Sequence, residues 1–328
     1  MDQKQQPLIG ESAAFLGMLE QVSRAANLNR PLLVVGERGT GKELIAERLH
    51  YLSERWDQPL VKLNCAAISP SLLESELFGH EAGAFTDASS RRIGRFEQAD
   101  GGTLFLDELA TTSAEVQEKI LRIIEYGEFE RLGSSATLSI DVRVVGATNE
   151  DLPAMAEIGR FRADLLDRLS FDVITLPPLR ERTDDIEPLA EHFAMRMSHE
   201  LGRELFAGFS ATASRQMLQH SWPGNVRELK NAVERAVYRL DDPTRKIKIL
   251  QLDPFDSPWR PKATAGSAER DYSGPLPNDL RAWLWQQELA IVERAVAEHG
   301  GNRQKAARRL GLSYDQIRGI LRKHSGHD

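Results

Sequence analysis

A glycine-rich segment that ends in a lysine has the residue types needed to bind a polyphosphate. It comprises Gly36, Glu37, Arg38, Gly39, Thr40, Gly41, Lys42 and Glu43, and an apolar run, residues 31–35, precedes it. Glycines allow consecutive backbone N–H groups to face a phosphate, and a lysine adds a positive charge. The apolar run reads as a strand, and a helix beginning at Lys42 would favour an anion at its N-terminus. A glycine-rich turn with a chance lysine is the alternative, which these flanking elements disfavour.

The last residue of this loop departs from the general pattern. Most loops of this type carry Ser or Thr where this chain has Glu43, and their hydroxyl group binds Mg²⁺. We therefore expect the metal to be held by other groups or through water.

A second segment supplies two carboxylates. Residues 101–106 predict an apolar strand that ends at Asp107 and Glu108. Asp107 suits Mg²⁺ coordination, and Glu108 suits activation of the attacking water. Alone, such a pair is equally well explained as surface charge. Together with Lys42, it supplies the phosphate cradle, metal site and water position that phosphoryl transfer from ATP requires.

Composition limits the class of protein. The 328 residues are 41% hydrophobic and 28% charged, which is typical of a globular chain of about two or more domains. The single cysteine, Cys65, cannot form an internal disulfide, and the histidines lack zinc-site spacing. The polar start has no signal-peptide core, and no apolar run approaches the roughly 20 residues that span a bilayer. We expect a cytoplasmic protein without membrane insertion.

The net charge of −7 is unevenly distributed. Residues 300–324 contain seven basic residues and one acidic residue, Asp315. A basic carboxyl-terminal segment on an acidic chain indicates that this end binds nucleic acid.

The pattern of apolar residues predicts an α/β domain followed by helices. Strands are expected at 32–35, 60–63, 103–106, 142–146 and 171–176, and they alternate with helical patterns such as 114–125. This alternation predicts a parallel sheet covered by helices. After Pro177 and Pro178, helices are expected at 185–201, 210–221 and 225–240. The expected domains are an ATPase α/β subdomain at 8–176, a helical lid subdomain at 177–250, a linker at 251–278 and a DNA-binding domain at 279–328.

The carboxyl-terminal residues predict a helix-turn-helix. A long helix at 278–299 is followed by a short helix to Leu310, a left-handed turn at Gly311 and a further helix capped by Ser313. Six apolar residues should form a shared core: Ala306, Ala307, Leu310, Leu312, Ile317 and Leu321. The second short helix would enter the major groove. The candidate DNA contacts are Arg303, Lys305, Ser313, Tyr314, Gln316, Arg318 and Arg322. A solvated basic helical hairpin is the alternative.

These features together resemble the bacterial enhancer-binding proteins, which are AAA+ ATPases that activate transcription by the sigma-54 form of RNA polymerase. The resemblance covers nearly everything from Leu8 to His324 and includes Glu43, the family's usual residue in that loop. It implies a Fis-type helix-turn-helix, ATP and Mg²⁺ as cofactors, a hexameric homo-oligomer, upstream enhancer DNA and sigma-54 polymerase as partners, and an envelope-stress operon as the target.

The resemblance also assigns roles to individual residues. Asn64 resembles the polar switch that restrains Glu108, and Thr148 and Asn149 resemble the first sensor of the γ-phosphate. Arg227 resembles the second sensor. Arg162 and Arg168 resemble arginine fingers that reach a neighbouring subunit's nucleotide.

The segment most specific to the family is the loop at 76–88, whose contact residues are Gly83, Ala84, Phe85, Thr86, Asp87 and Ala88. In the family this loop touches the sigma factor and usually has glycine where this chain has Asp87. Aspartate adopts left-handed backbone conformations more readily than most residues, so the turn can survive. A carboxylate at the contact surface leaves open an alternative, a DNA-binding repressor that does not activate through sigma-54. A general AAA+ enzyme that acts on DNA or unfolds protein is a third hypothesis.

About seven residues precede the ATPase domain in this chain, so we expect no built-in receiver domain. We therefore expect control to come from a separate molecule. The resemblance implies a separate inhibitory partner such as phage shock protein A. Trp56 is a candidate docking residue for that partner, and ordinary packing is its alternative role.

Overall fold

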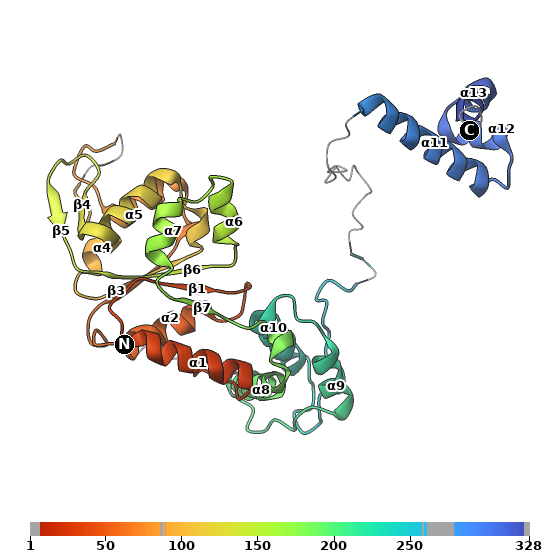
Figure 1. The fold of residues 1–328 in the computed structure, drawn as a ribbon. Coiled ribbons are helices and arrows are strands. Elements are labelled where there is room, and N and C mark those ends of the chain that lie inside the picture. Colours follow the sequence, from red (N-terminus) through yellow and green to blue (C-terminus); the bar gives the residue numbers. More distant parts are fainter. Residues whose placement is uncertain (1–6, 86–87, 89, 258, 261–278, 325–328) are drawn as a thin grey trace. The chain divides into compact units, whose positions relative to one another are not determined.

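The structure, a computed structural model, describes residues 7–85, 88, 90–257, 259–260 and 279–324 (Figure 1). The chain divides into two compact units, Met1–Asp256 and Ser257–Asp328. Within the described residues no helix is long and apolar enough to cross a membrane.

A five-stranded parallel sheet forms the centre of the first unit. Its strands are β1 (Leu32–Val35), β2 (Leu60–Asn64), β3 (Thr103–Asp107), β6 (Arg143–Thr148) and β7 (Val173–Thr175), in the order β2-β3-β6-β1-β7. All five expected strands and their parallel pairing are confirmed. Asn64 is opposite Asp107, and Val35 is opposite Thr148, so the chemistry-bearing residues gather at the carboxyl edge. Parallel sheets bind ligands at this edge, where the direction of winding changes.

Helices cover both faces of this sheet (Figure 1). One face carries α1 (Ala13–Ala26) and α2 (Lys42–Tyr51). The other carries α3 (Pro70–Phe78), α4 (Arg95–Gln98), α5 (Ala114–Tyr126), α6 (Leu152–Glu157) and α7 (Ala163–Leu169). Each helix buries an apolar stripe against the sheet, which is why the strands are apolar on both sides.

Helix α5 shows how the sequence sets these boundaries. Ser113 accepts a hydrogen bond from Val116 N (3.4 Å) and caps its start, and Gly127 ends it in the left-handed conformation (φ 67°). Behind it lies an antiparallel hairpin, β4 (Glu128–Glu130) and β5 (Thr137–Ser139). This hairpin was not predicted from the sequence, because three-residue strands give almost no periodic signal.

The helical lid follows in the same unit. Its helices are α8 (Ile186–Glu200), α9 (Ala211–Gln219) and α10 (Asn225–Tyr238), and the three expected helices are confirmed. Trp222 is fully buried at their centre and donates its indole N–H to Met217 O at 2.8 Å. Leu252 still packs on this core, so lid contacts continue past residue 250.

The second unit contains α11 (Leu280–Glu298), α12 (Arg303–Leu310) and α13 (Tyr314–His324). Gly311 has the expected left-handed conformation (φ 66°). Ser313 Oγ accepts from Gln316 N, and Gln316 Oε1 accepts from Ser313 N, which forms a capping box at α13. Ile317, Ala306 and Ala307 form the buried core with Val292 and Ala295, so the predicted helix-turn-helix is confirmed. Most of the expected linker, residues 261–278, lies outside the described residues.

Candidate functional site

The phosphate-binding loop joins β1 to α2 and uses glycine where the backbone requires it. Gly39 (φ 78°) and Gly41 (φ 102°) both have left-handed conformations. Lys42 is nearly buried, and its Nζ donates to Gly36 O at 2.9 Å. The pKa of Lys42 is lowered, because the effect of burial is larger than the opposite effect of the nearby Glu108 and Asp107 carboxylates. The lysine is therefore held inside the loop, facing the carboxylates.

The two carboxylates follow β3 directly. Asp107 Oδ2 accepts from Asn64 Nδ2 at 3.0 Å, and Asp107 Oδ1 accepts from Glu108 N at 3.0 Å. Glu108 has a left-handed backbone (φ 53°), which is uncommon outside glycine. Among the described residues, none donates a hydrogen bond to the Glu108 carboxylate. Asn64 thus pairs with Asp107 here, and its expected restraint of Glu108 stays a prediction.

A cavity of about 860 Å³ brings most of the predicted nucleotide-site residues together. Its lining includes Arg38, Gly39, Thr40, Gly41, Lys42, Glu43, Asn64, Asp107, Glu108 and Arg227. Gly36, Glu37, Thr148, Asn149, Arg162 and Arg168 do not line it. Within the described residues, no group of three or more His, Cys, Asp or Glu side chains could enclose a metal ion. A Mg²⁺ ion at Asp107 therefore needs oxygen ligands from water and phosphate, which suits its coordination preferences.

The candidate first sensor lies beside the loop. Thr148 is fully buried, and its carbonyl oxygen accepts from Gly36 N at 3.2 Å. Asn149 Nδ2 donates to Glu150 at 3.1 Å, while its Oδ1 is buried without a partner. The first-sensor role of both residues stays a prediction.

The lid contacts the phosphate-binding loop through a buried asparagine. Asn225 is fully buried; it accepts from Leu179 N (2.8 Å) and donates to Glu37 Oε2 (3.0 Å) and to Arg38 O (3.1 Å). Arg180 makes a bidentate ion pair with Glu37, with distances of 2.6 and 2.9 Å. The hydrogen bonds from Arg180 and Asn225 lower the pKa of Glu37 to about 2. Glu37 was expected in the phosphate cradle, whereas its side chain joins the loop to the lid.

Glycine also permits this close contact. A Cβ atom on Gly39 would lie 2.3 Å from Gly224 O, and Arg227 N donates to Gly39 O at 3.3 Å. The backbone of Arg227, the candidate second sensor, is therefore hydrogen-bonded to the phosphate-binding loop. The lid and the loop are in direct backbone contact at Gly39.

Several residues of this cavity were not predicted from the sequence. Arg182 is almost fully buried, lies over the Phe15 ring (5.2 Å) and donates to Thr40 O at 3.2 Å. Lys62 pairs with Glu43 (3.0 Å) and with Glu47, which raises the pKa of Lys62. The cavity lining also includes five apolar residues: Leu8, Ile9, Leu176, Leu189 and Val226. Leu8 and Ile9 precede α1, and Leu189 and Val226 belong to the lid, so no local motif marks these residues.

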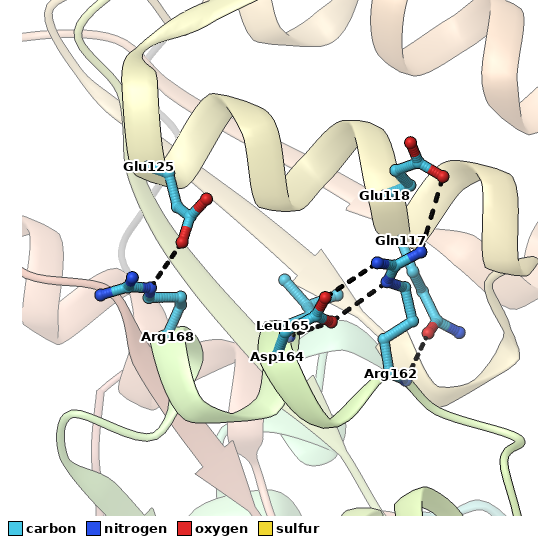
Figure 2. Close-up of polar contacts among 7 residues, drawn as sticks. All are labelled: Gln117, Glu118, Glu125, Arg162, Asp164, Leu165 and Arg168. Carbon is cyan, nitrogen blue, oxygen red and sulfur yellow. Dashed lines mark hydrogen bonds and ion pairs between the residues drawn. The ribbon is translucent and has the colours of Figure 1, made fainter.

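Arg162 and Arg168 lie away from the cavity and carry ion pairs within this chain (Figure 2). Arg162 contacts both carboxylate oxygens of Asp164 (3.1 and 2.8 Å) and Glu118 (3.5 Å). Arg168 Nε donates to Glu125 at 2.8 Å. Both side chains are more than a third exposed, so each is accessible to another molecule.

The loop at 83–88 is anchored at its base. Gly83 N donates to Ala88 O at 2.7 Å, and Gly83 has a left-handed backbone (φ 83°). Phe85 is 41% exposed, and its ring packs edge-on with the ring of His80, with 4.9 Å between the ring centroids. Thr86 and Asp87 lie outside the described residues.

The seven candidate DNA contacts of the second unit are all exposed: Arg303, Lys305, Ser313, Tyr314, Gln316, Arg318 and Arg322. Four of them lie on α13 and the other three lie on α12 or at the turn. In the first unit, Trp56 is 63% exposed, so the alternative that it packs in a core is wrong.

This combination of fold and site defines a class of protein. Residues 8–175 match the sigma-54 interaction domain family, residues 180–264 match the AAA+ ATPase lid domain, and residues 284–324 match the Fis family of bacterial regulatory proteins. The chain therefore belongs to the family of sigma-54-dependent transcriptional activators with an AAA+ ATP-binding domain and a DNA-binding helix-turn-helix.

Individual relatives agree with this assignment. The chain is 55% identical to the Psp operon transcriptional activator of Escherichia coli strain K12 over 97% of both chains. It is 45% identical to the Nif-specific regulatory protein of Azotobacter vinelandii, over 94% of this chain and 57% of that protein. Among solved structures, NtrX from Brucella abortus in complex with ATP is similar over 97% of this chain and 69% of that chain, with 32% identity and a TM-score of 0.70.

Proposed function

We propose that this chain hydrolyses ATP to remodel the closed complex of sigma-54 RNA polymerase into the open complex, while bound to upstream enhancer DNA. The observation that carries this proposal is the shared cavity, which joins Lys42, Asp107, Glu108 and Arg227. Asp107 would hold Mg²⁺, which would neutralise phosphate charge, and Glu108 would orient the attacking water. Lys42 would bind the outer phosphates.

Hydrolysis by a ring of identical subunits completes this proposal. Arg162 and Arg168 lie outside their own cavity and are accessible, which suits arginine fingers that reach the nucleotide of a neighbour in a hexamer. The exposed Phe85 at the end of its anchored loop would contact the sigma factor.

The similarity to the Psp operon activator supports an envelope-stress operon as the target. It also supports control by a separate inhibitor such as phage shock protein A, for which the exposed Trp56 is the proposed docking residue.

An open-complex assay with purified sigma-54 polymerase tests the proposed function. The full chain with ATP should open an enhancer-containing promoter, and Phe85→Ala should bind no sigma-54 in the presence of a transition-state analogue of ATP hydrolysis. Asp87→Gly should keep or improve that binding. If wild type fails to bind and only Asp87→Gly binds, the repressor alternative is correct for this chain.

A further inference from the structure

Helix α5 carries a glutamine on its buried face, where the pattern calls for an apolar residue. Gln117 is 1% exposed and shares this face with Val116, Ile120 and Leu121. A buried amide without hydrogen-bond partners would be destabilising, so its hydrogen bonds account for its presence.

Both ends of the Gln117 amide bind backbone groups of different segments. Its Oε1 accepts from Arg162 N at 2.9 Å, and its Nε2 donates to Thr112 O at 2.9 Å (Figure 2 shows the first of these). Thr112 ends the short 3₁₀ turn (Leu109–Thr111) that begins directly after Glu108. Arg162 is the N-cap residue of α7, so its N–H lies outside the helical hydrogen-bond ladder.

One side chain therefore joins the catalytic carboxylate segment to the backbone of a candidate arginine finger. The path from Glu108 runs through the 3₁₀ turn, where Thr111 N donates to Glu108 O (3.0 Å), to Thr112 and then across Gln117. By contrast, the ion pairs that the Arg162 side chain makes with Asp164 and Glu118 are exposed to solvent, and exposed ion pairs hold a side chain only weakly. The buried Gln117 amide, and not these ion pairs, fixes the position of the Arg162 backbone.

We propose that Gln117 is a positioning residue for the finger, holding Arg162 in a fixed place relative to the segment after Glu108 of the same subunit. Through Gln117, a change in the nucleotide site of one subunit alters the position of the arginine finger that the same subunit presents to its neighbour. This inference rests on the proposed function, in which Arg162 is an arginine finger that acts on the nucleotide of a neighbouring subunit.

Mixed rings test where the effect of Gln117 appears. A donor subunit carries Lys42→Ala, so its own site is inactive but it still presents fingers. An acceptor subunit carries Arg162→Ala and Arg168→Ala, so it has an intact site but no fingers. Only an acceptor site that faces a donor can hydrolyse ATP in the mixture.

Adding Gln117→Met to the donor should lower turnover at least ~10-fold, because a finger misplaced by about 1 Å loses most of its contribution. Adding the same change to the acceptor should lower turnover less than ~3-fold, and affinity for a non-hydrolysable ATP analogue should not change. Ile120→Val in the donor is the matched control, since it perturbs the same buried face without polar contacts. Thermal unfolding and ring assembly are measured for every variant.

Gln117→Asn serves as the second variant if Gln117→Met does not fold, because its amide is too short to reach both partners. A loss that is equal on the two sides, or that Ile120→Val reproduces, would overturn the positioning role. So would a donor change that leaves turnover intact. If the unmodified donor and acceptor mixture does not hydrolyse ATP although mixed rings form, the finger assignment itself is wrong and the inference falls with it.

Discussion

We expect individual residues of the cavity to differ in whether they act mainly in nucleotide binding or mainly in the chemical step. Lys42 Nζ donates to Gly36 O inside the phosphate-binding loop, and Asp107 is the last residue of β3. A phosphate cradle acts in both the ground state and the transition state, while metal placement matters most in the chemical step. We expect Lys42→Ala to weaken ATP binding and Asp107→Ala mainly to remove hydrolysis, each lowering turnover at least ~10²-fold. Nucleotide titration and steady-state turnover measure this, and equal loss of ATP affinity in both variants would contradict it.

Glu37 gives a prediction about pH. Its pKa falls from 4.5 to about 2 because Arg180 and Asn225 donate hydrogen bonds to it. A lowered folded-state pKa adds stability that is fully present above pH 4.5 and is lost as the pH falls toward 2. The pair is partly exposed, so we expect less than ~1 kcal/mol.

Urea unfolding of wild type and Glu37→Gln at pH 6, 4 and 3 measures this contribution. The difference in the free energy of unfolding should be largest at pH 6 and should shrink at each lower pH. Glu20→Gln, an exposed carboxylate on α1, should show no such trend. A difference that grows as the pH falls would refute the assigned cause.

At the scale of elements, the junction between lid and phosphate-binding loop depends on one buried amide. Asn225→Ala removes the acceptor for Leu179 N and the donor to Arg38 O, and it leaves buried backbone groups unpaired. We expect a loss of about 1–3 kcal/mol in the free energy of unfolding of the first unit, together with weaker nucleotide binding.

Arg180→Ala is the matched control for this junction, because it removes the exposed end of the same network. It should destabilise the first unit less than Asn225→Ala does, because an exposed ion pair is screened by solvent. Equal destabilisation by the two variants in urea unfolding would show that burial of Asn225 is not what matters.

At the scale of the whole molecule, the two compact units each have their own hydrophobic core. Deleting residues 279–328 should therefore abolish enhancer binding and leave ATPase activity. Gel-shift assays on a two-fold-symmetric site and steady-state hydrolysis measure the two properties, with the full chain as the reference. A truncated protein that binds nucleotide but does not hydrolyse it at any concentration would contradict this independence.

The sequence by itself determined the parallel sheet, the lid helices and the helix-turn-helix, because each depends on local periodicity and on turn residues such as Gly311. It also determined the chemistry-bearing residues, since Lys42 and Asp107 belong to short motifs at strand ends. These signals are local, so a single sequence is enough to find them.

Only the tertiary structure decided which of these residues meet. Lys42 and Arg227 both line the cavity, although they are about 185 positions apart in the chain. The Glu37 side chain lies toward the lid, where it accepts from Asn225, and does not line the cavity. Gln117 carried one visible signal, a polar residue in an apolar stripe, but its two partners lie on other segments. Contacts of this kind depend on which distant elements pack together, and the periodic pattern of one element does not identify the element that it packs against.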